Sequence, residues 1–496
     1  MKRLRPLMFA GTGSDVGKSV LAAGFCRIFK QDGYNPAPFK AQNMALNSAV
    51  TPEGLEIGRA QAVQAEACGI EPCADMNPVL LKPQGESISQ LVLNGKAVGS
   101  VDAFDYYKSR QREILRREAC GAFDRLAARY SPIVMEGAGS ISELNLRDGD
   151  IVNMSMARHA GAAVVLVADI ERGGVFASAY GSIMLLSEDD RKLVKGIIVN
   201  KFRGDVRLFD DGVKILEDVC KVPVLGVVPY FDDIHIEEED SMELNAKRTG
   251  ATDDGRVNAA VVKLRHISNF TDFDALEHDP RVNLFYCDAP GKLADADIII
   301  LPGSKNTLAD LDSLRRNGMA EAVTKAASDG KTILGICGGY QMMGTAVADP
   351  HGVEGDGGHA KGLCLLPVST RLDKEKTLKQ AVFTLAQDGS GAMNGYEIHN
   401  GVTTPDGDAA CPPLFTKSDG QADGCIIGGK RMGTYMHGAL DNPAFVDFLL
   451  STCHKTKTAE GGISDYKVFK EKQYNMLAAL IRRHVDIEKT YGIMRE

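Results

Sequence analysis

Cys337 has the clearest chemical potential in the sequence, because it stands between glycines in GICGGYQ, after the apolar run of residues 332–334. A strand, a sharp glycine-flanked turn and a helix form a nucleophile elbow, in which glycines tolerate a strained backbone. The start of a helix favours a thiolate, and the N–H of Gly338 can stabilise a developing oxyanion. The alternative is a buried structural cysteine. The flanking glycines favour a nucleophile.

A cysteine nucleophile needs a base, and His437 is the leading candidate. It directly follows an apolar, strand-like stretch in RMGTYMHG. A thiol–imidazole pair is the ordinary means of acyl transfer at neutral pH. His399 is the rival, because it also stands where a strand meets a loop, but we expect it to have a buried, hydrogen-bonded role. The sequence therefore predicts a Cys337–His437 dyad.

Phosphate chemistry is predicted near the N-terminus, in GTGSDVGKS at residues 11–19. A predicted strand precedes this loop and a predicted helix follows it, which is the context that a P-loop requires. Backbone N–H groups of such a loop, here including Gly13 and Gly17, point at phosphate oxygens. Lys18 would reach the terminal phosphates, and Ser19 would place its hydroxyl on Mg²⁺. The strict motif has glycine where Thr12 stands here.

Two carboxylates are candidates to complete a magnesium site with Ser19. Glu136 ends a predicted strand in SPIVMEGAGS, at the same sheet edge as the glycine loop. Mg²⁺ prefers oxygen ligands and is usually held by one or two carboxylates together with phosphate. Glu56 is the second candidate, at the start of a predicted helix. Its alternative role is that of a solvated first-turn acid favoured by the helix dipole.

Polar residues near the same edge are predicted to bind a substrate. Lys40 follows a predicted second strand in PFKAQNM, and ligands of open α/β sheets bind at the carboxyl ends of the strands. Gln42 and Asn43 supply neutral hydrogen-bonding groups beside it. Lys82 lies just past another short predicted strand. We assign these four residues to substrate binding.

Repeated alternation of strands and helices predicts a mostly parallel, doubly wound α/β sheet that positions the loop residues. We expect the ATP-binding domain to span residues 1–232. An acidic stretch at 233–256 breaks the alternation and is typical of a linker. A second α/β domain is expected at 257–450, and a helical extension at 451–496.

Composition limits the function classes. The chain has 496 residues, of which 44% are hydrophobic and 25% charged, and a net charge of −9. There is no basic footprint for nucleic acid and no apolar run that would span a membrane. The basic N-terminus is followed by an apolar run that is too short for a secretion signal. Eleven cysteines without framework spacing indicate a reducing cytoplasm.

Local motifs resemble two known groups of enzymes. The elbow resembles that of class I glutamine amidotransferases, which implies that a loop near Gly303 contributes the second oxyanion N–H. Family glutaminases often place a glutamate two residues beyond the histidine, but here Ala439 stands there, so no orienting acid is named. The longer loop spacing and VMEGAGS resemble dethiobiotin synthetase, whose ATP activates a carboxylate. In related nucleotide-binding proteins, an asparagine at the position of Asn200 binds the adenine edge.

Taken in order, the motifs resemble the cobyric acid synthase family over nearly the whole chain. They are GTGSDVGKS, FKAQNM, EIGRAQAVQAEACG, MNPVLLKP, VMEGAGS, LVADIERGGVFAS and GYEIHNG. The resemblance implies amidation of the b, d, e and g carboxylates of adenosylcobyrinic acid a,c-diamide with ATP, Mg²⁺ and glutamine. It implies small-molecule partners, namely the corrinoid, glutamine and ATP. It also leads us to expect a protected route for ammonia between two sites.

Three alternatives remain open at this stage. A cobyrinic acid a,c-diamide synthase would act on the a and c carboxylates instead. A partitioning-type P-loop ATPase would need neither Cys337 nor His437, and commonly has an additional lysine early in the loop, which residues 11–16 lack. An amidotransferase of cell-wall intermediates is the third.

Overall fold

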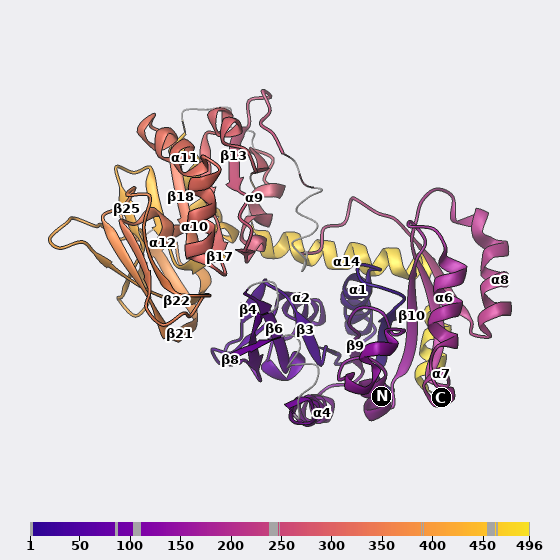
Figure 1. Cartoon of the computed structure of the whole chain (residues 1–496). Coiled ribbons are helices and arrows are strands. Elements are labelled where there is room, and N and C mark those ends of the chain that lie inside the picture. The colour runs from indigo at the N-terminus through magenta and orange to yellow at the C-terminus, as the bar shows by residue number, and fades with distance from the viewer. Residues whose placement is uncertain are drawn as a thin grey trace.

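The first domain is built on a six-stranded, all-parallel sheet in the order β12-β11-β10-β1-β9-β2. The computed structural model describes residues 3–84, 88–102, 111–237, 247, 249–387, 389, 391–453, 462 and 465–495. The elements of this domain are β1 (Leu7–Gly11), α1 (Lys18–Gln31), β2 (Ala37–Phe39), α2 (Arg59–Cys68), α4 (Gln111–Arg129), β9 (Ile133–Glu136), α5 (Met154–Ala160), β10 (Ala163–Asp169), α6 (Val175–Met184), α7 (Glu188–Arg191), β11 (Val194–Phe202), α8 (Asp210–Cys220) and β12 (Val224–Pro229). Helices cover both faces of the sheet (Figure 1).

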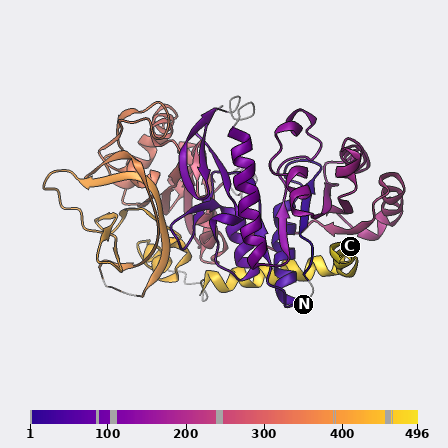
Figure 2. The ribbon, with the colours of Figure 1, turned by 90° about the horizontal axis from the view of Figure 1, so that it is seen from below.

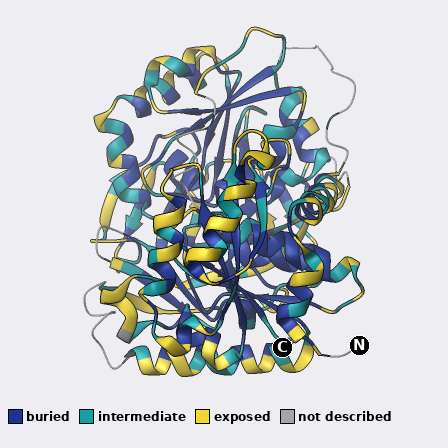
Figure 3. Cartoon of the chain, turned by 90° about the vertical axis from the view of Figure 1, so that its right-hand side faces the viewer, coloured by how far each residue is buried: buried dark blue, intermediate teal, exposed yellow. Residues whose placement is uncertain are grey.

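The core of this domain has two halves, one on each face of the sheet. Successive residues of a strand point to opposite faces. Leu7 and Phe9 therefore pack with α1, whereas Met8 and Ala10 pack in a second cluster with α4, α5 and α6. Figure 3 shows the buried strands enclosed by helices whose outer faces are exposed. The prediction of a doubly wound parallel sheet is confirmed.

A small sheet and a two-stranded ribbon lie between β2 and α4. Their strands are β3 (Gln42–Met44), β4 (Ser48–Val50), β5 (Glu56–Gly58), β6 (Val79–Pro83), β7 (Ile88–Leu93) and β8 (Lys96–Asp102). Glu56 begins strand β5 and not a helix, so that local prediction is wrong; the helix α2 starts at Arg59. The hairpin expected near Asn94 and Gly95 is present, and both residues have the positive φ that a two-residue turn requires.

The second domain has a six-stranded sheet, β15-β13-β16-β18-β26-β25, in which only the edge strand β25 is antiparallel. A second sheet follows the order β20-β19-β21-β22-β27. The elements are β13 (Val257–Val262), β14 (Ile267–Ser268), α9 (Asp274–His278), β15 (Val282–Cys287), β16 (Ile298–Leu301), β17 (Gly303–Ser304), α10 (Thr307–Arg316), α11 (Met319–Ser328), β18 (Thr332–Ile336), α12 (Gly338–Met343), β19 (Ala346–Asp349), β20 (Gly358–Lys361), β21 (Val368–Leu385), β22 (Met393–Pro405), β23 (Phe415–Lys417), β24 (Ala422–Asp423), β25 (Cys425–Ile427), β26 (Arg431–Thr434), β27 (Met436–His437) and α13 (Pro443–Ser451). Cys411 and Cys425 are joined by a disulfide.

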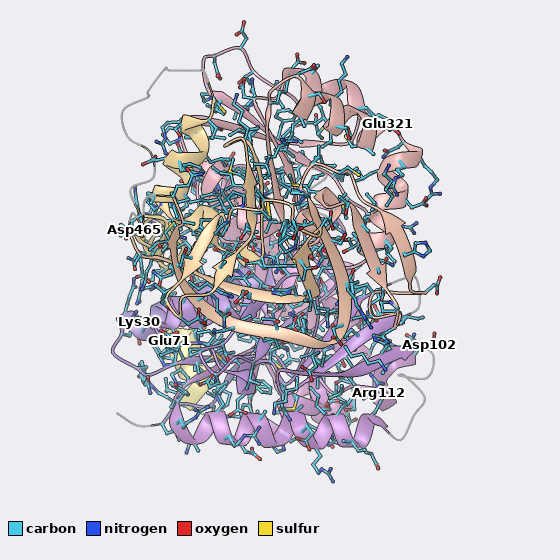
Figure 4. The ribbon with its side chains drawn as sticks, turned by 90° about the vertical axis from the view of Figure 1, so that its left-hand side faces the viewer. Lys30, Glu71, Asp102, Arg112, Glu321 and Asp465 are labelled. Carbon is cyan, nitrogen blue, oxygen red and sulfur yellow. A yellow bond between two sulfur atoms is a disulfide. The ribbon has the colours of Figure 1, made fainter. Side chains whose placement is uncertain are left out.

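The two domains are in direct contact. Strands β21 and β22 both contact β4 of the first domain. Figure 4, in which the second domain faces the viewer, shows these long strands lying across the first domain. Within the ranges that the structure describes, no helix is both long and apolar enough to cross a membrane.

The C-terminal extension returns to the first domain. Helix α14 (Tyr466–His484) packs on α1 and β12, and α15 (Ile487–Arg495) follows it (Figure 2). A Cβ on Gly24 of α1 would overlap the side chain of Ile481, and would lie 3.2 Å from Cγ of Leu477. Glycine at position 24 therefore permits the close approach of the two helices. The chain thus begins and ends in the same domain.

Candidate active sites

The Cys337 segment has the geometry of a nucleophile elbow. Cys337 connects β18 directly to α12, with φ +51° and ψ −109°. A Cβ on Gly338 would lie only 2.7 Å from the backbone nitrogen of Ser304, and one on Gly339 would overlap the carbonyl oxygen of Leu301. Glycines are thus required for the turn to pack against the neighbouring strand end. A strained φ in a non-glycine residue is typical of functional sites.

His437 is held by a carboxylate that the sequence did not reveal. Oδ2 of Asp272 lies 2.7 Å from Nδ1 of His437, and the backbone N–H of Gly438 donates to Asp272 Oδ1 at 3.1 Å. Asp272 lies in the short 3-10 turn η5 (Phe270–Phe273). The side chains of His437 and Asp272 are only 1% and 4% exposed. The acid that orients the imidazole therefore comes from far upstream in the chain.

The electrostatics of His437 favour its protonated form. Burial alone would lower its pKa, but the charge and hydrogen bond of Asp272, with a smaller contribution from Cys337, raise the pKa to about 10. Its other ring nitrogen, Nε2, is buried and makes no hydrogen bond of ordinary geometry within the described residues. Nε2 is thus the atom that can exchange a proton with the Cys337 thiol. Sγ of Cys337 is directed to the carbonyl oxygen of Ile398, at 3.7 Å.

The predicted oxyanion residues converge on this pair. Gly303 and Ser304 form β17, which pairs with β14. A Cβ on Gly303 would lie 3.7 Å from Cε1 of His437, and Ser304 packs against Gly338. The roles of Gly303 and Gly338 stay predictions. The rival base, His399, has other partners. Its Nδ1 donates to the Gly401 carbonyl at 2.8 Å, and its ring stacks on Tyr435.

The phosphate loop of the first domain is pre-shaped by its own contacts. Gly17, with φ +93°, leads directly into α1. The ammonium group of Lys18 donates to the carbonyls of Gly13 at 2.8 Å and Gly139 at 3.0 Å. Burial lowers the pKa of Lys18 to about 8, although the charge of Glu136 opposes this shift. A phosphate bound at Lys18 would raise the pKa of this lysine again, because a nearby negative charge favours the ammonium form.

Glu136 is the centre of a buried network at the end of β9. Its Oε1 accepts from Ser19 Oγ at 2.8 Å and from Lys40 Nζ at 2.7 Å, and its Oε2 accepts from Gln64 at 2.8 Å. Burial would raise the pKa of Glu136, but Lys40 and the hydrogen bonds lower it overall. The hydroxyl of Ser19 and the carboxylate of Glu136 are thus adjacent hard oxygen donors, which suits Mg²⁺. Gln64 was not predicted.

A cavity of about 1720 Å³ begins at this network and extends toward the second domain. Its volume suits a ligand much larger than a nucleotide alone. Asn200 donates from Nδ2 to the Val16 carbonyl at 2.9 Å, so in the described residues it supports the loop itself. Of the predicted residues, those lining the cavity are Gly17, Lys18, Ser19, Lys40, Gln42, Asn43, Glu136 and Asn200.

Glu56 and Lys82 lie in a different place from the phosphate loop. Oε1 of Glu56 accepts from Lys82 at 2.7 Å and from Ser48 at 2.9 Å, and its Oε2 pairs with Lys376 of β21 at 2.5 Å. Burial opposes ionisation of Glu56, but the two lysines hold its pKa well below the usual range. Because ammonium groups engage both oxygens, we leave Glu56 out of the magnesium site. It joins the two domains instead.

Besides Gln64, the sequence did not identify Asp272, which holds the histidine, or Lys376, which pairs with Glu56. Asp272 stands in NFTDFD and Lys376 in DKEKT, and neither stretch has a motif that marks it. The weak signal for Asp272 is an acid between two phenylalanines, a setting that predicts a buried carboxylate in need of a partner. Lys376 lies in a charged run that is typical of a solvated surface.

Comparison with known proteins extends this picture to the whole chain. Residues 7–244 match a family described as the CobQ/CobB/MinD/ParA nucleotide binding domain, and residues 258–445 match the CobB/CobQ-like glutamine amidotransferase domain. A cobyric acid synthase of Bacteroides fragilis is 60% identical over 495 residues, which cover 100% of this chain and 99% of the relative. The cobyric acid synthase of Phocaeicola vulgatus is 58% identical, and covers 99% of both chains. That of Klebsiella pneumoniae is 48% identical, over 99% of this chain and 98% of the relative. The predicted order of an ATP domain followed by a glutaminase domain is confirmed.

Proposed function

The chain belongs to the cobyric acid synthase family, and we propose from this premise that it amidates the b, d, e and g carboxylates of adenosylcobyrinic acid a,c-diamide. Glutamine supplies the nitrogen and ATP the driving force. The observation that carries the proposal is the presence, in one chain, of a Cys337–His437–Asp272 relay and of a phosphate loop that faces a carboxylate. Use of ATP supports a cytoplasmic location, as predicted.

Glutamine hydrolysis follows from the first site. The thiolate of Cys337 attacks the side-chain amide carbon, and the negative charge that develops on the oxygen is stabilised by the N–H groups of Gly303 and Gly338. His437 gives its Nε2 proton to the leaving nitrogen, so ammonia departs and a thioester remains. His437 then takes a proton from water, which attacks the thioester and releases glutamate. Asp272 holds the imidazolium throughout.

Carboxylate activation follows from the second site. A carboxylate is a poor acyl donor, so its oxygen attacks the terminal phosphorus of ATP to give an acyl phosphate and ADP. Lys18 neutralises charge on the phosphates, and Lys40 stands beside the reacting groups. Ammonia attacks the acyl carbon, phosphate leaves, and an amide remains. Ammonia that escaped into water would mostly become non-nucleophilic ammonium, which supports a protected route between the sites.

A divalent cation fits the donors of the second site. Ser19 and Glu136 would hold Mg²⁺, because their oxygens are adjacent and hard. When bound, the ion supplies charge neutralisation for the phosphates. Lys40 already pairs with the same carboxylate, so Glu136 positions both groups around the nucleotide.

The decisive experiment is mass spectrometry of the corrinoid after incubation with ATP, Mg²⁺ and glutamine. Four successive exchanges of hydroxyl for amino on the a,c-diamide are expected. Conversion of the diacid precursor into the a,c-diamide would instead favour the sister amidase.

Two variants separate the half-reactions. Cys337→Ala should abolish glutamine-driven amidation and keep the reaction with high external ammonium, whereas Lys18→Ala should abolish both. Loss of both nitrogen sources in Cys337→Ala would contradict the separation of sites. Cys453→Ala, at a half-buried cysteine of the same domain, serves as the matched control and should behave as the wild type.

A further inference from the structure

Three lysines from separate parts of the chain gather beside the elbow. Lys82 comes from β6, Lys376 from β21, and Lys305 directly follows β17. All three lie in a buried electrostatic cluster with two glutamates, Glu56 and Glu354. Lys82 and Lys376 are both paired with Glu56, at 2.7 Å and 2.5 Å. The reaction steps proposed above use none of these lysines.

Lys305 is the lysine of this cluster that lacks a direct hydrogen-bond or ion-pair partner in the described part of the chain. Lys305 is only 6% exposed, and within the described residues its side chain makes no hydrogen bond or ion pair. The other glutamate, Glu354, accepts from the backbone N–H of Thr307 at 2.9 Å. Three lysines thus face two glutamates, and burial raises the pKa of Glu354. A buried ammonium without a partner is costly, which makes the position receptive to an anion.

Lys305 also directly follows, in the chain, two residues that adjoin the reacting groups. It is two residues after Gly303, which adjoins His437, and one residue after Ser304, which packs on Gly338. Its neighbour Lys82 is close enough to Cys337 for their charges to interact. In glutamine, three carbon atoms separate the amide carbon, which must reach Cys337, from the α-carboxylate. A substrate seated on the thiol therefore carries an anion into this region.

We propose that Lys305 binds the α-carboxylate of glutamine and makes the glutaminase site specific for an amide that carries an anionic end. The proposal rests on the function proposed above. A charge-assisted hydrogen bond to the carboxylate supplies the partner that Lys305 lacks. This requirement has a purpose in an enzyme that makes primary amides: an amide without a nearby carboxylate is rejected, so the corrinoid product is protected from hydrolysis.

A substrate analogue and a variant test this role together. L-glutamine α-amide replaces the carboxylate by a neutral group. Lys305→Met keeps the stem and removes the charge, and Lys325→Met, on the exposed side of α11, is the control. We expect Lys305→Met to lower kcat/KM for glutamine about 10²–10³-fold, the effect of removing one member of a buried charge pair. The α-amide should be a poor substrate for the wild type. Lys305→Met should hydrolyse the α-amide with the same kcat/KM as the wild type does.

The outcomes are distinguishable. An unchanged KM for glutamine in Lys305→Met, or equal losses with glutamine and the α-amide, would overturn the proposal. Ammonium-driven amidation reports whether the variant is folded, and Lys305→Arg should recover part of the preference for glutamine. If the wild type releases no glutamate at all, the proposed function fails. If it releases glutamate but hydrolyses the α-amide just as well, only the role of Lys305 fails, and this measurement needs no variant.

A pH profile gives an independent readout. Burial and the facing charges of Lys376 and Lys82 lower the pKa of Lys305 to about 7, while Glu354 and Glu56 oppose the shift. The profile of kcat/KM reports ionisations of the free enzyme. As pH rises through this value Lys305 loses its charge, so the ratio of kcat/KM for glutamine to that for the α-amide should fall. Cys337 and His437 act on both substrates and cancel in the ratio. A ratio constant between about pH 6 and 8 would contradict the proposal.

Discussion

The substitution Asp272→Asn tests the relay at one atom. Asparagine has the shape of aspartate, and its side-chain oxygen can keep the hydrogen bond from Gly438 N–H, now 3.1 Å long. Its NH₂ group would then face Nδ1 of His437, where Oδ2 of Asp272 now lies at 2.7 Å. A donor at this point requires Nδ1 to be an acceptor, which leaves the proton on Nε2. In that tautomer, the imidazole cannot take the proton of Cys337.

The size of the effect follows from the electrostatics. The pKa of His437 is raised from 6.5 to about 10, chiefly by Asp272 acting against burial. At 1.36 kcal/mol for each pKa unit, this is about 5 kcal/mol between the two protonation states. This order of magnitude agrees with the cost of about 3–5 kcal/mol for removing one partner of a buried charge pair. We therefore expect a fall in glutamine-dependent kcat of about 10²–10⁴-fold.

The assay compares glutamate release with ammonium-driven amidation. Asp272→Asn should lose the first and keep the second within about twofold, because the ATP site is untouched. Asp274→Asn is the matched control: it lies two residues away, and burial already raises the pKa of Asp274 well above its ordinary value. A loss of less than tenfold in a folded Asp272→Asn protein would refute the reasoning. So would an equal loss with both nitrogen sources.

Three further substitutions test the rest of the architecture. Glu136→Gln should raise the KM for Mg²⁺-ATP and lower the rate of amidation about 10²-fold with either nitrogen source. Glutamate release without corrinoid should be retained. A titration with ATP measures the KM, and an unchanged KM would contradict the prediction. Lys376→Met leaves Glu56 with one ammonium group, so the free energy of unfolding, measured in urea, should fall by about 3 kcal/mol. Lys379→Met is the control, because Lys379 lies on the same strand but is exposed, and it should change the free energy of unfolding little. Leu477→Ala should cost about 2–5 kcal/mol, seen as a lower Tm, because its side chain is fully buried under α1; an unchanged Tm would mean that α14 is not part of the first domain's core.

The sequence was sufficient to locate the two centres, because each is specified by neighbours in the chain. In the elbow, a Cβ on Gly335 would lie only 2.7 Å from the backbone nitrogen of Tyr340, five residues away, so this part of the motif is local. The same holds for the loop ending in Lys18, whose ammonium group bonds a carbonyl five residues away. Where backbone geometry and chemistry are set by one short segment, spacing alone is informative.

The residues that escaped prediction are those whose partners are distant in sequence. The position two residues after His437 holds Ala439, whereas Asp272 reaches the imidazole from the turn η5, 165 residues upstream. The sequence predicts Glu56 as a magnesium ligand, with a solvated first-turn acid as the alternative, yet Lys376, 320 residues further on, pairs with it. Periodicity reports which residues are buried, but it does not report which buried charges meet.

Distant contacts also connect the first domain to the residues that hold His437. Asn269 has a φ of +51°, and its side-chain oxygen accepts from the backbone N–H of Ser48 at 3.1 Å. Its side-chain nitrogen lies 3.4 Å from Nδ1 of His437. Asn47 in turn accepts from the backbone N–H of Phe270 at 3.2 Å, at the start of the turn that carries Asp272. The start of strand β4 in the ATP domain thus contacts the segment that carries the relay. A movement of this region when the first domain binds its substrates would alter the His437–Asp272 geometry directly.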